Sequence, residues 1–144
     1  MLSVLVAGTA IWWAQLYAVS DEAVFRPGDG ISLTPILGEV PEVILADGIT
    51  ATATTPPLSF RACFTTPLSQ AMLTETYRVY PHPLPPADPV LPCFDAPRLA
   101  AALKTGEAIA FLSEHDSAPG VDRVVAVFPD GHAVAWQQPD LKEP

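Results

Sequence analysis

The chain has 144 residues, a comfortable size for one domain with a single core. Its 7 basic and 16 acidic residues give a net charge of −9, which excludes ordinary nucleic-acid binding and electrostatic docking on anionic lipid, because both need a basic surface. All of these charges and all 17 prolines follow residue 20, so the chain divides into an uncharged apolar segment and an acidic, proline-rich one.

Residues 1–20 would rise about 30 Å as a helix, which matches the hydrocarbon thickness of a bilayer. A cleavable export signal usually begins with basic residues and this segment has none, although residues 18–20 are similar to a cleavage site and processing before Asp21 stays open. We therefore predict a transmembrane anchor over residues 1–20, a linker over residues 21–30 and an exported domain over residues 31–144.

One face of the predicted anchor carries small side chains. Ala10, Ala14 and Ala18 recur every four residues, a spacing that lets another membrane helix approach closely. Gln15 adds a polar amide within the span. We expect contact with an integral membrane protein through Ala7, Ala10, Ala14, Gln15 and Ala18, while the alternative is that alanine is simply common in membrane helices.

The charges beside the anchor predict its orientation. No basic loop precedes the helix, and Asp21 and Glu22 follow it. A short N-terminus then stays inside, and the acidic domain is expected outside the cytoplasmic membrane.

The first half of the exported domain reads mainly as strands. "VILADGITATA" places Asp47-Gly48 between two β-rich runs, which predicts a hairpin turn. "LSFRACF" predicts a strand. Thr66-Pro67 predicts the start of a helix with Thr66 as the cap, and "LTETYRVY" alternates like a strand.

A proline-rich stretch and a helix come next. Residues 81–92 hold six prolines, which exclude a helix or a central strand and predict a stiff spacer, with a ligand for an aromatic groove as the alternative. Asp95 is a good cap for a helix over residues 96–105, with Lys104 near its C-terminal dipole and Gly106 as its end.

Three strands end the chain. "EAIAFLSE", "VDRVVAVF" and "HAVAWQQ" read as three strands, and Pro129-Asp130-Gly131 joins the last two. The predicted fold class is α+β: an N-terminal transmembrane helix, then a small antiparallel-sheet domain with one or two short helices. We expect the helix over residues 96–105 to cover one face of the sheet.

Cys63 and Cys93 are the only cysteines, and both lie in the predicted exported part. In an oxidising compartment two cysteines of one small domain most simply form a disulfide. Closing a loop of this length would stabilise the fold by roughly 3 to 4 kcal/mol. The alternative is a nucleophilic thiol with a histidine as its base, which would need a free cysteine.

Other constellations for chemistry are scarce. His82, His115 and His132 are far apart in sequence and form no metal-binding spacing, so we expect no metal, cofactor or catalytic residues. Glu114, His115 and Asp116 could form an acid–base cluster, but "SEHDSAPG" favours a solvated turn. No nucleophile elbow, phosphate loop or dinucleotide fingerprint occurs.

Three stretches, "FRACFTTPLSQAMLTETY", "CFDAPRLAAAL" and "GVDRVVAVFPDGHAVAW", resemble the shared blocks of an uncharacterised family of small single-pass proteins in alphaproteobacteria. Some members carry a histidine kinase label, which this chain is too short to support. The family has no assigned activity. The resemblance implies that Cys63 and Cys93 belong to the family pattern, and that the exported domain lies in the periplasm, with the anchor in the inner membrane.

These features lead us to expect a non-enzymatic, membrane-anchored periplasmic accessory or assembly subunit of a larger membrane complex. A respiratory or photosynthetic electron-transfer complex is the suggested host, and a basic periplasmic protein such as a soluble cytochrome is a suggested partner. The alternatives are a ligand-sensing module, which predicts a substantial pocket, and a thiol-dependent enzyme.

Overall fold

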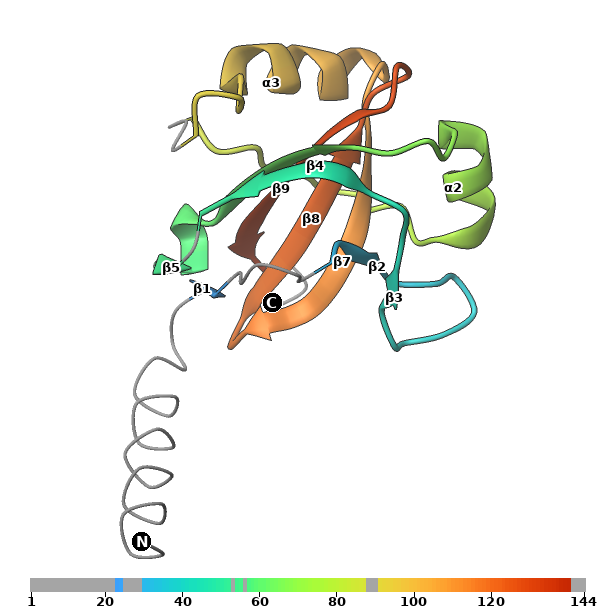
Figure 1. The fold of residues 1–144 in the computed structure, drawn as a ribbon. Helices are drawn as coiled ribbons and strands as arrows, with labels where there is room; N and C mark the ends of the chain where they lie inside the picture. The colour runs from blue at the N-terminus through green and yellow to red at the C-terminus, as the bar shows by residue number, and fades with distance from the viewer. Residues whose placement is uncertain (1–22, 25–29, 53, 56, 88–90, 141–144) are drawn as a thin grey trace, which may run out of the picture.

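The computed structural model describes residues 23–24, 30–52, 54–55, 57–87 and 91–140. Its main element is a five-stranded antiparallel sheet in the order β4-β6-β9-β8-β7 (Figure 1). The strands are β4 (Asp47–Ala51), β6 (Arg61–Thr65), β7 (Ile109–Ala118), β8 (Val121–Val127) and β9 (His132–Pro139). Two short pairs join β1 (Ala23–Val24) to β5 (Thr54–Thr55) and β2 (Ser32–Leu33) to β3 (Glu42–Val43). The helical elements are η1 (Pro57–Ser59), α2 (Gln70–Thr76) and α3 (Ala96–Thr105).

The small antiparallel-sheet domain with two short helices is therefore confirmed. Within these described ranges, no helix is long and apolar enough to cross a membrane. The predicted anchor over residues 1–20, with Ala7, Ala10, Ala14, Gln15 and Ala18, lies outside the described residues.

The strands β7, β8 and β9 form the predicted meander. Val124 and Val125 of β8 point to opposite faces of the sheet, as the alternation of a strand requires, and both are fully buried. The turn between β8 and β9 ends at Gly131, which has φ +93°, and a Cβ there would lie 2.7 Å from the carbonyl oxygen of Thr66. Glycine is therefore required at this turn for both conformation and space.

Both faces of the sheet are covered, whereas the sequence predicted a helix on one. On the first face α3 packs with Phe94 against a cluster of buried side chains, Ala110, Val124, Ala126 and Trp136. On the other face Leu33 of β2 and Leu73 of α2 pack against a second cluster, Phe60, Phe64, Phe111, Val125 and Val127. The β2–β3 hairpin and α2 thus supply a layer that the sequence analysis did not predict.

Helix α3 has the predicted ends. The side chain of Asp95 accepts a hydrogen bond from the backbone N–H of Arg98 at 3.1 Å, and Gly106 ends the helix with φ +84°. Lys104 lies in the last turn, where it favours the negative end of the helix dipole.

Helix α2 begins later than predicted. Its cap is Ser69, whose Oγ accepts from the backbone N–H of Met72 at 3.1 Å, while Thr66 accepts from Leu68 in a local turn. The strand predicted for residues 73–80 is wrong over residues 73–76, which are the end of this helix. The helix prevails there because it buries Leu73, a packing that alternation alone does not reveal.

The hairpin predicted at Asp47-Gly48 is also wrong. Both residues belong to β4, which pairs with β6, and the register shifts between Asp47 and Thr50. Gly48 has φ +61°, so this glycine serves an irregularity within a strand rather than a turn. An Asp-Gly pair favours both features, and pairing with a strand further along the chain decides between them.

The predicted disulfide is confirmed: Cys63 of β6 is bonded to Cys93, and their Cα atoms are 6.4 Å apart. The bridge fastens the central sheet to the segment that leads into α3. Of the predicted spacer, residues 81–87 and 91–92 are described, and they form neither helix nor strand.

Candidate functional site

A cavity of about 760 Å³ lies beside β7. Its inner wall is an extended segment that runs along β7: Tyr80 donates its backbone N–H to Ala110 at 2.8 Å, and Leu112 donates to Arg78 at 3.0 Å. The β2–β3 loop forms another side. The lining includes Glu39, Pro41, Arg78, Tyr80, His82, Glu114, His115, Asp122 and Asp140.

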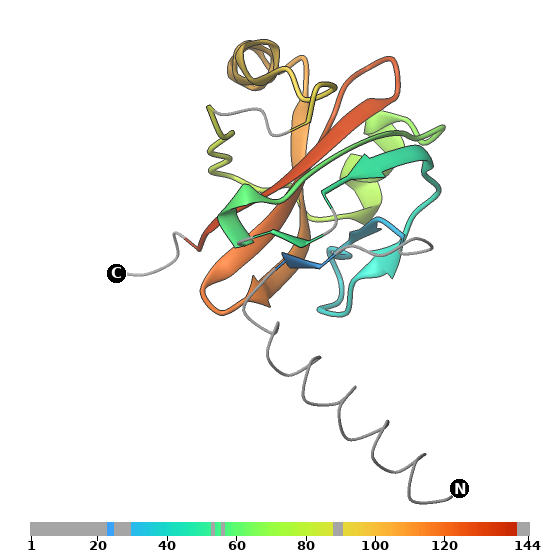
Figure 2. The same ribbon diagram turned by 60° about the vertical axis from the view of Figure 1, so that its left-hand side comes forward.

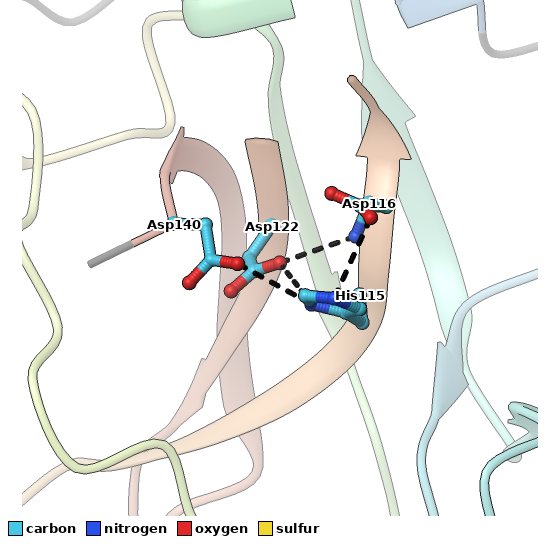
Figure 3. Close-up of side chains that lie close together, drawn as sticks. All are labelled: His115, Asp116, Asp122 and Asp140. Carbon is cyan, nitrogen blue, oxygen red and sulfur yellow. Dashed lines mark hydrogen bonds and ion pairs between the residues drawn. The ribbon is translucent and has the colours of Figure 1, made fainter. Parts of the chain in front are cut away.

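Asp122 is the buried centre of a hydrogen-bond network in this cavity. Its side chain, on β8, is only 4% exposed. One carboxylate oxygen accepts from the Tyr80 hydroxyl at 2.9 Å. The other lies 2.8 Å from Nδ1 of His115 and accepts from the backbone N–H of Asp116 at 3.1 Å (Figure 3). These partners offset the cost of removing a carboxylate from water and hold it in one orientation.

His115 lies between three carboxylates. Besides the contact with Asp122, its Nε2 is 3.5 Å from Asp116 and its Nδ1 is 3.9 Å from Asp140. The ring is about half exposed, so it faces the cavity. Figure 3 shows the four side chains converging from β7, β8 and the end of β9.

An irregular stretch of β7 aims His115 at its partners. The register between β7 and β8 shifts between Leu112 and Glu114 and again before Ala118. Within this stretch Asp116 has φ +52°, a left-handed conformation that few residues other than glycine adopt. Bulges bend a strand and redirect its side chains, and here the result is the contact between His115 and Asp122.

The same four side chains are candidates for a cation site. One ligand atom from each of His115, Asp116, Asp122 and Asp140 lies within 4.8 Å of the others. Imidazole nitrogen and carboxylate oxygen are suitable ligands for divalent transition metals.

The structure corrects the interpretation of "SEHDSAPG" as a solvated turn. Residues 113–118 belong to β7, and His115 takes part in the network rather than lying free in solvent. His82 lines the same cavity, whereas His132 lies elsewhere and contacts Asp130. Sequence reasoning missed Asp122 completely. One signal was present in the sequence: Asp122 stands at the start of the apolar run "VDRVVAV", which is typical of a buried strand. A carboxylate in such a strand is seldom buried without a partner, so its position indicated a polar network.

The electrostatic character of the cavity is acidic. Its wall includes Glu39, Glu114, Asp122 and Asp140. The guanidinium of Arg78 is directed to the β2–β3 loop, where Nε donates to the carbonyl of Pro35 at 3.0 Å and Nη2 to that of Gly38 at 2.8 Å. The cavity therefore favours a cationic group.

We expect Tyr80 to make the domain sensitive to high pH. Burial, and then the hydrogen bond to Asp122, raise the pKa of Tyr80 above its ordinary value of 10.0. The unfolded chain therefore releases this proton at a lower pH than the native state does. The stabilisation is complete below about pH 10 and is lost progressively as the pH rises further. Urea unfolding at a series of pH values should show this decline, and Tyr80→Phe should flatten it.

Tyr77 provides the matched control for this titration. Its pKa is also raised, mainly by burial, but its hydroxyl contacts Glu42 on the surface at 3.4 Å. Tyr77→Phe should leave most of the alkaline decline in place. An unchanged decline in Tyr80→Phe would contradict the assignment of this stability to Tyr80.

The family comparison covers the whole of this site. A family model described as a family of unknown function (DUF6446) matches residues 31–142, which include every lining residue of the cavity. No curated protein and no solved structure matches the chain.

Proposed function

The chain belongs to the DUF6446 family, whose function is unknown, and we propose that it is a non-enzymatic, membrane-anchored accessory subunit. Its exported domain would bind a partner protein of a larger membrane complex. A basic side chain of that partner would enter the acidic cavity.

The observation that carries this proposal is the charge of the cavity wall. Glu114 and Asp140 face a space of about 760 Å³, a volume within the usual range of binding sites. An ammonium or guanidinium group there would form charge-assisted hydrogen bonds, which are roughly twice as strong as neutral ones. The net charge of −9 would also attract a basic partner from a distance.

The disulfide supports an oxidising location and weakens one alternative. Cys63 and Cys93 are bonded to each other, so neither is a free nucleophile, and the thiol-dependent enzyme loses the group on which it depended. Disulfides persist mainly outside the cytoplasm, which supports the proposed periplasmic placement behind an inner-membrane anchor over residues 1–20.

A respiratory or photosynthetic electron-transfer complex is our proposed host, and a basic soluble cytochrome is a proposed contact. The acidic charge of the domain supports this pairing, since such encounters are steered electrostatically.

A ligand-sensing module is the second candidate, favoured by the size of the same cavity. In that case a small organic cation rather than a protein would occupy it. Calorimetry of the full chain with small organic amines, which are cations at neutral pH, separates the two candidates. An accessory subunit should not bind a free amine tightly, whereas a ligand-sensing module should.

Binding of the partner should depend on the cavity carboxylates. The full chain, tagged after Pro144 and solubilised in mild detergent, should retain a stoichiometric membrane partner. The double variant Glu114→Gln with Asp140→Asn should reduce that affinity roughly tenfold at low salt and make it less sensitive to salt. Quantitative co-purification across a salt series measures both effects.

Glu75→Gln is the matched control, because Glu75 is an exposed carboxylate of α2 that does not line the cavity. It should bind like the wild type. Equal affinities for the cavity variant and this control would contradict the role of the cavity, and a wild-type chain that purifies alone would count against an accessory subunit.

A further inference from the structure

The segment from residue 36 to residue 45 exposes large apolar side chains on the surface. Leu37 is 97% exposed, Val40 77% and Val43 71%. Ile36 and Leu45 belong to the same group, and we call these five residues the docking segment. We propose that the docking segment is the surface on which the domain binds its membrane partner, and that the partner presents an apolar surface bordered by Lys or Arg. This inference rests on the proposed function.

The loop that carries the docking segment is held in place by hydrogen bonds. Arg78 binds two of its carbonyl groups, those of Pro35 and Gly38, and Ile36 donates its backbone N–H to Thr76 at 2.9 Å. Tyr77 also pairs with Pro35 in an isolated bridge. An apolar surface that is ordered before binding loses less conformational entropy when a partner covers it.

Two carboxylates between the residues of the docking segment indicate the chemistry of the partner. Glu39 and Glu42 are exposed between the apolar side chains, and Glu39 with Pro41 also lines the acidic cavity. The apolar and acidic surfaces are therefore continuous. An anionic lipid surface would repel these carboxylates, and a second copy of the chain would present the same acidic surface to itself. A protein with basic side chains around an apolar centre complements both the apolar side chains and the carboxylates.

The position of the docking segment fits a partner in the membrane. Only residues 21 and 22 separate the proposed anchor from β1, and three peptide steps extend about 10 Å at most. In Figures 1 and 2, β1 and the β2–β3 hairpin both lie at the end of the domain opposite α3. With the anchor inserted, this end would face the membrane.

Site-specific photocrosslinking in native membranes tests the proposal. A photoreactive amino acid is placed at Leu37 or at Val40 of the full chain, and the products are identified by mass spectrometry. We expect both positions to label one membrane protein, within a peptide that combines apolar residues with Lys or Arg. Leu84 is the control position, since it is apolar and 53% exposed but lies outside the docking segment. Adducts with lipid, adducts with a second copy, no adducts, or equal labelling from Leu84 would each overturn the proposal.

A matched pair of variants separates this inference from the proposed function. Leu37→Ser with Val40→Ser should lower recovery of the crosslinked protein at least tenfold, whereas Leu84→Ser should not change it. Both variants should keep the wild-type urea midpoint, because the replaced side chains are exposed. If the partner still binds the double variant but is lost with the cavity variant, the docking surface is wrong and the accessory function stands. If the wild type binds no partner, both fail.

Discussion

Replacing Cys63 and Cys93 with alanine lowers the free energy of unfolding by roughly 3 to 4 kcal/mol, the first of two large expected effects. The two cysteines are 30 residues apart, and their bond links β6, inside the sheet, to the segment before α3. Without this bond the unfolded chain gains the conformational freedom of a loop that contains α2 and the proline-rich stretch. Urea unfolding of the full chain in mild detergent, followed by circular dichroism, measures the loss.

The reduced wild-type protein is the control for this prediction. With a thiol reductant it should approach the stability of the double variant, and the double variant itself should not respond to reductant. A loss below about 1 kcal/mol would show that the bond constrains the unfolded chain far less than loop closure predicts.

The second large effect is expected at Trp136. Its side chain is completely buried on the α3 face of the sheet. It meets the ring of Phe94 edge to face with centroids 6.5 Å apart, and its indole N–H donates to Gln138 at 3.0 Å. Trp136→Ala leaves a cavity under α3 and removes one of the two hydrogen bonds that Oε1 of Gln138 accepts, the other coming from the backbone N–H of Leu84, so we expect a loss of about 3 to 5 kcal/mol. That loss is a large part of the total stability of a domain of this size.

Two further variants test the cause of this loss. Trp136→Phe keeps much of the packing and removes part of the ring together with the hydrogen bond to Gln138, so it should lose clearly less stability than alanine. Leu84→Ala removes an exposed apolar side chain, and it should change the free energy of unfolding by less than about 0.5 kcal/mol. Equal losses for phenylalanine and alanine at position 136 would mean that the hydrogen bond, rather than burial, accounts for the stability.

The core position of Trp136 also makes it a useful probe. Of the three tryptophans, the other two lie within the first 20 residues, so Trp136 is the one that reports on the domain over residues 31–142. Its fluorescence in the wild type should follow the same unfolding transition as circular dichroism if the domain unfolds in one step.

Features whose causes lie within a few neighbouring residues could be predicted from the sequence. The cap at Asp95 and the end at Gly106 define α3, and both depend on groups within one helical turn. The apolar runs over residues 109–139, separated by short turns, predict β7, β8 and β9. The pairing of Cys63 with Cys93 followed from their number and the predicted compartment.

The errors arose where distant segments decide between local alternatives. Asp47-Gly48 favours a turn or a bulge equally, and pairing with β6 selects the bulge. Residues 77–80 are extended because they bridge to Pro35, just after β2, and to Phe111 of β7. Residues 73–76 stay helical because Leu73 packs against the sheet. No pattern within either segment distinguishes these outcomes.

The acidic cavity was decided entirely by the tertiary structure. Tyr80 and Asp122 are 42 residues apart and share a hydrogen bond. Glu39 and Pro41, which come much earlier in the chain, line the same cavity. Local geometry, cysteine number and composition were enough to predict the strands of the meander, α3, the disulfide and the acidic charge. The sequence did not predict that His115, Asp122 and Asp140 lie together. Strand register brings these side chains together, and their spacing along the chain does not reveal that register.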